Sequence, residues 1–221
     1  MNRKIAAIAA MCVLSGSAVW AKDGKVELSG TAGWTFSDGV SGNGVIVPGV
    51  GTFDSVDPKD AFSWGARLGF NLSPNFELGF LYDAQSTNLQ LEGTSSVEFA
   101  DVTIRNYHGY FAYNFGDSDA TVRPYFLGGV GATQYGSVSV NVGDTQHGID
   151  SSTKFSTTWA LGLKAFPSPK FGIRLEGRWT PTYIKSDATG WWCDPYWGCY
   201  VTSDSQYSNQ FELSGGVILR F

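Results

Sequence analysis

Apolar and polar residues alternate with a period of two through most of the chain, and this pattern constrains the fold most strongly. In the last segment, 210–221, every second residue is apolar or glycine and the residues between are mostly polar. Such alternation is typical of β-strands, whose successive side chains point to opposite faces. Seven further segments share the pattern: Lys25–Phe36, Ser63–Phe70, Phe76–Asp83, Tyr107–Phe115, Val122 to about Val140, Thr158–Ala165 and Phe171–Thr180. The sequence therefore predicts an all-β fold of about eight strands.

The connections between these segments alternate in length. Short turns are predicted after the second, fourth and sixth strands, around Ser73–Asn75, Gly116–Asp119 and Pro167–Pro169. Longer segments follow the other strands, at roughly Ser37–Asp60, Gln90–Val97, Asn141–Ser152 and Ser186–Ser205. Short turns at one end and long loops at the other are typical of outer-membrane barrels, whose short turns face the periplasm. We expect an eight-stranded antiparallel up-and-down transmembrane β-barrel.

The two faces of the predicted strands differ in chemistry. One face is aliphatic and aromatic, whereas the other carries charges interleaved with glycine and alanine. The charged residues on the polar face are Arg67, Glu77, Asp83, Arg123, Lys164, Arg174, Glu176, Arg178, Glu212 and Arg220. In a secreted soluble barrel the apolar face would point inward. The small residues favour the opposite arrangement, because they leave room for long charged side chains in a narrow lumen.

Charges enclosed in such a lumen need partners, because an unpaired buried charge is strongly destabilising. We expect ion pairs that fill the lumen and hold the barrel rigid. The alternative is a gated or open pore for small solutes, lined by the same groups. The sequence pattern does not identify which charges pair.

The N-terminus has the features of a secretory signal peptide. Arg3 and Lys4 precede the apolar run Ile5–Leu14 and a stretch of small residues that ends at Ala21. The apolar run is too short to span a bilayer as a helix of about 20 residues. We predict a signal peptide at residues 1–21 and one barrel domain at 22–221. The mature domain would carry 13 basic and 20 acidic residues, a formal charge of −7, so we expect no nucleic-acid partner.

Three stretches resemble the outer-membrane β-barrel superfamily that includes the transmembrane domain of outer membrane protein A and its small relatives. They are 123–131 (RPYFLGGVG), 171–179 (FGIRLEGRW) and 217–221 (VILRF). The terminal Phe221, with Leu219 and Val217, looks like the signal read by the barrel-assembly machinery. The resemblance implies that machinery and periplasmic chaperones as transient partners, and outer-membrane lipid and lipopolysaccharide as surroundings. Unlike outer membrane protein A, the chain ends at its closing strand, so cell-wall anchoring by a periplasmic domain is not implied.

The segment Gly190–Tyr200 combines two cysteines with an unusual density of aromatic rings. Cys193 and Cys199 are expected to form a disulfide, because the periplasm is oxidising and no nearby histidine completes a metal site. The rings have two interpretations: packing in the loop or at the membrane interface, and contact with an external ligand. The candidate contact residues are Trp191, Trp192, Tyr196 and Trp197.

Catalysis is not expected. His108 and His147 are the only histidines, and no serine or acidic residue lies near either at a recognisable motif spacing. No pattern for a phosphate, dinucleotide or calcium loop is present, so no cofactor or metal is expected. We interpret the chain as a monomeric outer-membrane barrel of structural or surface-interaction type. A small-solute pore is the alternative, and a lipid-modifying enzyme is a third, less favoured class.

Overall fold

The computed structural model describes residues 25–38, 40–47, 51–93, 97–117, 119–142, 145–149, 151–184, 193–194, 198–199 and 207–221. The predicted signal peptide lies outside these residues, as do Trp191, Trp192, Tyr196 and Trp197. None of the described residues forms a helix long and apolar enough to cross a membrane.

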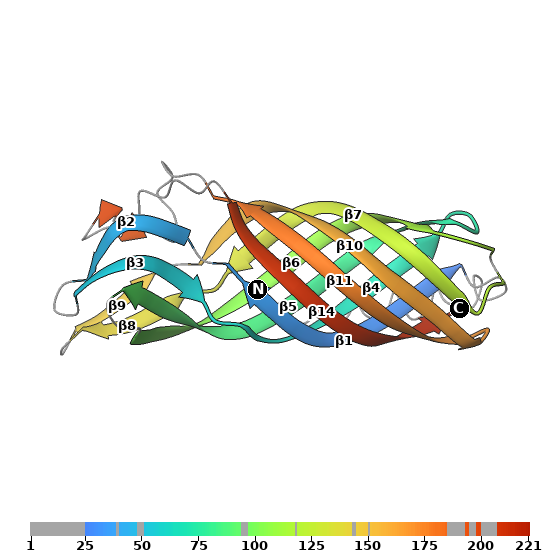
Figure 1. Ribbon diagram of the computed structural model, residues 1–221, viewed down its shortest axis with the longest axis horizontal. Helices are drawn as coiled ribbons and strands as arrows, with labels where there is room; N and C mark the ends of the chain where they lie inside the picture. Colours follow the sequence, from blue (N-terminus) through green and yellow to red (C-terminus); the bar gives the residue numbers. More distant parts are fainter. Residues whose placement is uncertain are drawn as a thin grey trace, which may run out of the picture.

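Eight antiparallel strands close into a barrel (Figure 1). Around the barrel they are β1 (Val26–Ser37), β4 (Ala61–Asn71), β5 (Phe76–Gly93), β6 (Val97–Asn114), β7 (Val122–Tyr135), β10 (Ser152–Ser168), β11 (Phe171–Tyr183) and β14 (Tyr207–Arg220). Each strand pairs with its neighbour along this order, and β1 pairs with β14 from Glu27↔Arg220 to Ser37↔Gln210. The predicted eight-stranded antiparallel barrel is confirmed.

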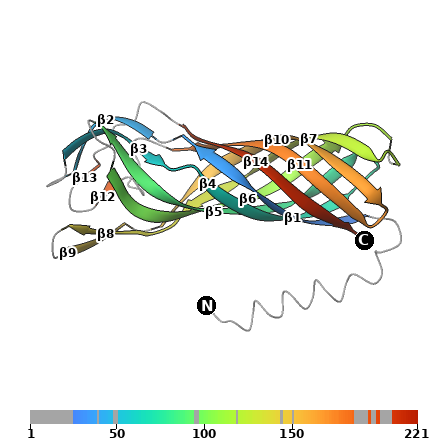
Figure 2. The ribbon, with the colours of Figure 1, turned by 60° about the horizontal axis from the view of Figure 1, so that its bottom comes forward.

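The long connections contain further strands instead of irregular loops. The hairpin of β2 (Val40–Val47) and β3 (Gly51–Pro58) joins the barrel sheet through β3, which pairs with the far half of β5. The hairpin of β8 (Val138–Val142) and β9 (Thr145–Ile149) follows β7. A small hairpin of β12 (Cys193–Asp194) and β13 (Gly198–Cys199) lies at the same end (Figure 2). The strand predicted to run to about Val140 instead ends at Tyr135, and two residues separate it from β8.

The opposite end of the barrel has short turns, as the connection lengths predict. Leu72 N donates to Phe76 O at 2.8 Å between β4 and β5, and Phe115 N donates to Pro124 O at 2.8 Å between β6 and β7. Gly116 in the second turn has a φ of +82°, a conformation that glycine adopts without a steric penalty. The last residue, Phe221, lies at this end beside the start of β1 (Figure 1).

The outer wall is apolar and the lumen is polar. Large apolar side chains on the outer face are strongly exposed, such as Phe80 at 68% and Leu161 at 66%. Aromatic rings border this band toward the hairpin end, where Trp64 meets Tyr82 and Tyr82 meets Tyr107, and toward the short turns, where Phe76 meets Tyr113. An apolar band between two aromatic belts suits the hydrocarbon of a bilayer and its interfaces.

Candidate functional site

The candidate site is the lumen, where five cationic and five anionic side chains of the described residues are buried. The cations are Arg67, Arg123, Lys164, Arg174 and Arg178, and the anions are Glu27, Glu77, Asp83, Glu176 and Glu212. All lie at inward-facing positions of the alternating pattern. The formal charges of these ten side chains cancel, and Arg220, which is partly exposed at the short-turn end, adds one positive charge.

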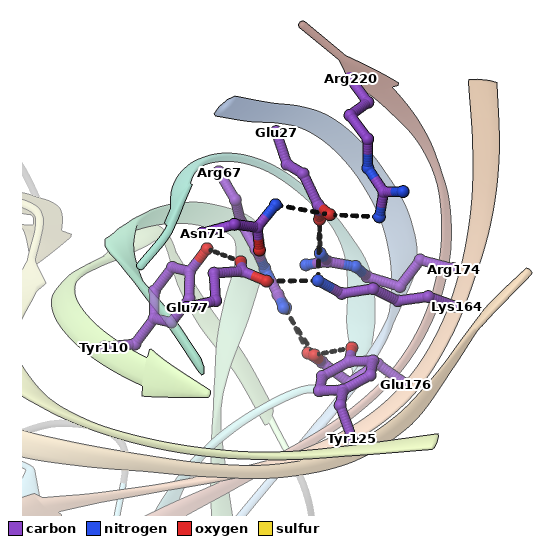
Figure 3. Close-up of polar contacts among 10 residues, drawn as sticks. All are labelled: Glu27, Arg67, Asn71, Glu77, Tyr110, Tyr125, Lys164, Arg174, Glu176 and Arg220. Carbon is purple, nitrogen blue, oxygen red and sulfur yellow. Dashed lines mark hydrogen bonds and ion pairs between the residues drawn. The ribbon is translucent and has the colours of Figure 1, made fainter. Parts of the chain in front are cut away.

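An arginine–carboxylate pair occupies the middle of the lumen. Arg67 of β4 donates two hydrogen bonds to the two carboxylate oxygens of Glu176 on β11, with Nη1 at 2.5 Å from Oε2. The hydroxyl of Tyr125 on β7 donates to the same carboxylate. The bidentate geometry is the strongest form of ion pairing available to arginine. Three strands from separate parts of the wall are thereby connected through one carboxylate (Figure 3).

A second cluster lies toward the short turns, around Glu27 and Glu77 (Figure 3). Lys164 Nζ is 2.7 Å from Glu27 Oε2 and also contacts Glu77. Arg220 Nη2 lies 2.8 Å from Glu27 Oε1, and the Tyr110 hydroxyl donates to Glu77 Oε1 at 2.7 Å. Lys164 therefore links two carboxylates on different strands.

Two more arginines complete this end of the lumen. Arg174 Nη2 is 3.9 Å from Glu27 Oε2, and its guanidinium carbon lies 5.3 Å from the centre of the Tyr125 ring. Arg123 donates to the carbonyl of Pro74 at 2.7 Å. Arg123 therefore links the turn between β4 and β5 to the start of β7 by a hydrogen bond.

A third cluster lies toward the hairpin end. Arg178 Nη2 of β11 is 2.9 Å from Asp83 Oδ2 on β5 and also contacts Glu212 on β14. The side-chain amide of Asn106 donates to Asp83 Oδ1 at 2.9 Å and to Gln210 Oε1 at 3.0 Å. Because β5 and β11 are four strands apart in an eight-stranded ring, the Arg178–Asp83 pair crosses the full width of the lumen.

His108 has a serine neighbour that its sequence context does not reveal. His108 Nε2 lies 2.9 Å from Ser156 Oγ, a contact between strands that no motif spacing in the sequence indicates. The two are brought together across the sheet, because Gly131 pairs with both and has no side chain between them. Ser156 also accepts from Thr133 at 3.0 Å, and both His108 and Ser156 are buried. The contact therefore fills this part of the lumen with two hydrogen-bonded polar side chains.

Glycines on the inner face make room for the large polar side chains. A Cβ at Gly79 would lie 2.7 Å from the Tyr110 hydroxyl, and one at Gly162 would lie 2.5 Å from the Tyr125 ring. These tyrosines supply hydrogen bonds to Glu77 and Glu176. Inward glycines beside the rings are therefore part of the same network.

All ten residues predicted on the polar face lie at inward positions: nine are buried, and the Arg220 side chain is 18% exposed. The sequence reasoning missed Glu27, the anion with the most partners, although it lies between the outward-facing Val26 and Leu28 and opposite Arg220. It also missed the roles of Tyr110 and Tyr125. The signal that could have found Glu27 is the alternation itself, extended to the first residues of β1.

The other predicted residues that the structure describes are Cys193, Cys199, Val217, Leu219 and Phe221. The backbone register of β12 and β13 places Cys193 opposite Cys199. Val217, Leu219 and Phe221 face outward and are 49%, 44% and 44% exposed. Within the described ranges, no group of three or more histidine, cysteine, aspartate and glutamate residues has the geometry of a metal site.

A family model, the outer membrane protein beta-barrel domain, matches residues 5–219. The chain belongs to this family. The fold, the apolar outer band and the polar lumen are those of an outer-membrane barrel, as the resemblance in three stretches of sequence implied. The family includes proteins of different activities, so membership alone leaves the role of this barrel open.

Solved structures of similar fold come from several outer-membrane barrels. Neisserial surface protein A is 16% identical with a TM-score of 0.50, covering 90% of this chain and 97% of that one. OprG from Pseudomonas aeruginosa is 10% identical with a TM-score of 0.58, covering 90% and 97%. The outer membrane protease OmpT from Escherichia coli is 10% identical with a TM-score of 0.47, covering 90% and 98%. At 16% and 10% identity, the likeness to the first two shows the fold alone. No curated protein sequence matches the chain.

Proposed function

We propose that this barrel is a structural or surface-interaction protein of the outer membrane, without catalytic activity, whose lumen does not conduct solutes. The observation that carries the proposal is the set of side-chain contacts that cross the lumen at three levels. Arg178 reaches Asp83, Arg67 reaches Glu176, and Lys164 joins Glu27 to Glu77. Each level connects strands that are three or four positions apart around the wall.

The paired charges favour a closed lumen over a pore. Separating a buried ion pair leaves two charges without partners, and that is strongly destabilising in a narrow, poorly hydrated channel. Tyr110 and Tyr125 add bulk at the same levels, and both are buried. A small-solute pore remains the alternative, because a chain of charged side chains also suits a gated constriction.

Conductance in planar bilayers distinguishes these functions. The wild-type barrel is expected to give no discrete channels, whereas a triple variant Arg67→Ala, Tyr110→Ala, Tyr125→Ala is expected to give them, because it truncates side chains that fill the lumen. Lys170→Gln, in an exposed short turn, is the matched control and should stay silent. Wild-type channels that disappear when Arg174 and Arg178 are replaced would establish the pore instead.

The hairpins beyond the barrel are the proposed interaction surface. The β2–β3 hairpin, the far halves of β5 and β6, and the β8–β9 hairpin form a projection at one end of the molecule (Figures 1 and 2). We place the aromatic segment around β12 and β13 in the same role. Replacing Trp192 and Trp197 with Ala should reduce binding to cells, glycans or lipopolysaccharide, and unchanged binding to all three would refute this contact.

Biogenesis partners follow from the closing strand. Val217, Leu219 and Phe221 present alternate apolar side chains on the outer face of the barrel at its C-terminus. We propose that the barrel-assembly machinery and periplasmic chaperones recognise this segment before the barrel closes. The closed ring of eight strands leaves no barrel edge to be completed by a second copy, which supports a monomer.

A further inference from the structure

The outer wall changes from apolar to polar at one level on two adjacent strands. On β6 the outward residues are aromatic or glycine from Tyr113 to Tyr107, and the next outward residue is Arg105. On β5 the outward series Tyr82 and Ala84 continues with Ser86 and Asn88. The register pairs Arg105 with Ala84. Arg105 is thus the first outward charge above the aromatic belt on this part of the wall.

A polar hollow of about 450 Å³ lies at this level. Outward-facing residues supply most of its lining: Ser86, Asn88, Asp101, Thr103, Arg105 and Gly136. Its size falls within the range of small-molecule sites, roughly 300–1,000 Å³. The backbone around it is fixed, because Gly136 N donates to Thr103 O at 2.8 Å where β7 ends beside β6.

The hollow combines a cation with hydroxyl groups and a carboxylate. No ion pair joins Arg105 to another residue that the structure describes, and its side chain is partly exposed beside the hollow. Asp101 is exposed and can accept hydrogen bonds, and Thr103 between them supplies a hydroxyl. Arginine recognises phosphate through paired N–H donors, whereas a carboxylate repels phosphate but accepts from sugar hydroxyls.

We propose that this hollow binds the phosphorylated sugar headgroup of an outer-leaflet glycolipid of the same membrane. The position of the hollow indicates that the headgroup belongs to a membrane lipid. The hollow begins one outward residue above Tyr107, at the level where lipid headgroups contact the protein. Arg105 binds the phosphate, and Asp101 with the neighbouring hydroxyls binds the sugar. The site lies on the outer wall and is independent of the lumen.

The test measures the affinity of the folded barrel in detergent for purified lipopolysaccharide. Arg105→Gln is expected to weaken binding about tenfold, since it removes a charge-assisted contact. Asp101→Asn should weaken binding to lipopolysaccharide but not to phosphatidylglycerol vesicles, which carry phosphate without a sugar. Lys170→Gln removes a charge at the opposite end and should bind as the wild type does. The gel shift on boiling checks that each variant is folded.

Four results would overturn the proposal. Unchanged affinity of folded Arg105→Gln would refute the contact between Arg105 and phosphate. An equal loss of affinity in Lys170→Gln would show that the lipid is attracted by the net charge of the protein alone. Equal affinity for lipopolysaccharide and phosphatidylglycerol would refute recognition of the sugar. Competition by millimolar inorganic phosphate would assign the hollow to a free anion instead of a membrane lipid.

Discussion

At the scale of single residues, the lumen shows how charged side chains are kept in a buried space. Glu176 accepts from both Arg67 and Tyr125, so each of its oxygens has a donor. Gly162 leaves the space that the Tyr125 ring occupies. Removing one of the side chains of Arg67, Tyr125 and Glu176 therefore leaves buried polar atoms of the others without a partner. That is more destabilising than replacing all of the partners by apolar side chains of the same shape.

Glu176→Gln is expected to lower the free energy of unfolding by about 3 kcal/mol, because Arg67 stays buried without a counter-charge. The double variant Arg67→Met, Glu176→Gln should recover most of the loss, since the amide that replaces the carboxylate still accepts from Tyr125. Denaturant unfolding in lipid vesicles, followed by tryptophan fluorescence, measures both. Asp119→Asn, in an exposed turn, is the control, and equal stability of Glu176→Gln and this control would contradict the prediction.

At the scale of elements, alternation located the barrel strands but not the hairpins. The strands of the barrel face lipid on one side and a polar lumen on the other, so their pattern is regular. The β2 segment, Val40–Val47, contains two glycines and pairs with β3 through a register shift, so it has no regular period. Strand β3 is held by pairing with β5, a contact between distant segments that a local pattern cannot reveal.

The β12–β13 hairpin gives a prediction at this scale. Directly opposed residues of an antiparallel pair have Cα atoms about 4.5–5.5 Å apart, within the range that a disulfide needs. Protein exported to the outer membrane should therefore resist thiol alkylation at Cys193 and Cys199 until it is reduced, as mass spectrometry can show. Cys193→Ser with Cys199→Ser should change barrel stability by less than about 0.5 kcal/mol, because the hairpin lies beyond the barrel. Alkylation of both cysteines without reduction would rule the disulfide out.

At the scale of the molecule, the sequence predicted most of the charged residues that line the lumen but not how they pair. Whether a side chain faces the lumen or the lipid depends only on the alternation of residues along its strand. Pairing across the lumen depends on the stagger of the strands around the ring, which brings Arg178 opposite Asp83 and Asn106 opposite Gln210. That stagger is a property of the closed barrel, so no local pattern encodes it.

The closed barrel should survive in detergent until it is heated. Protein expressed with its N-terminal segment is expected to be in the outer-membrane fraction. Its mobility on a gel should change on boiling, and the mature protein should begin at Lys22. Gel electrophoresis with membrane fractionation and intact mass checks these points together. A soluble periplasmic product whose mobility does not change on boiling would contradict the membrane assignment, and a mature mass that retains residues 1–21 would contradict the cleavage site.

The pairing of the first strand with the last has a kinetic consequence. Val26 and Phe221 exchange backbone hydrogen bonds of 3.2 and 2.9 Å, so the pairing of β1 with β14 joins the two most distant parts of the barrel sequence. A chain lacking β14 is an open sheet with two unpaired edges, and lipid offers those edges no hydrogen-bond partners. Closure must therefore wait until β14 is available to pair with β1, and the open sheet depends on another protein's strand or on water to satisfy its edges in the meantime.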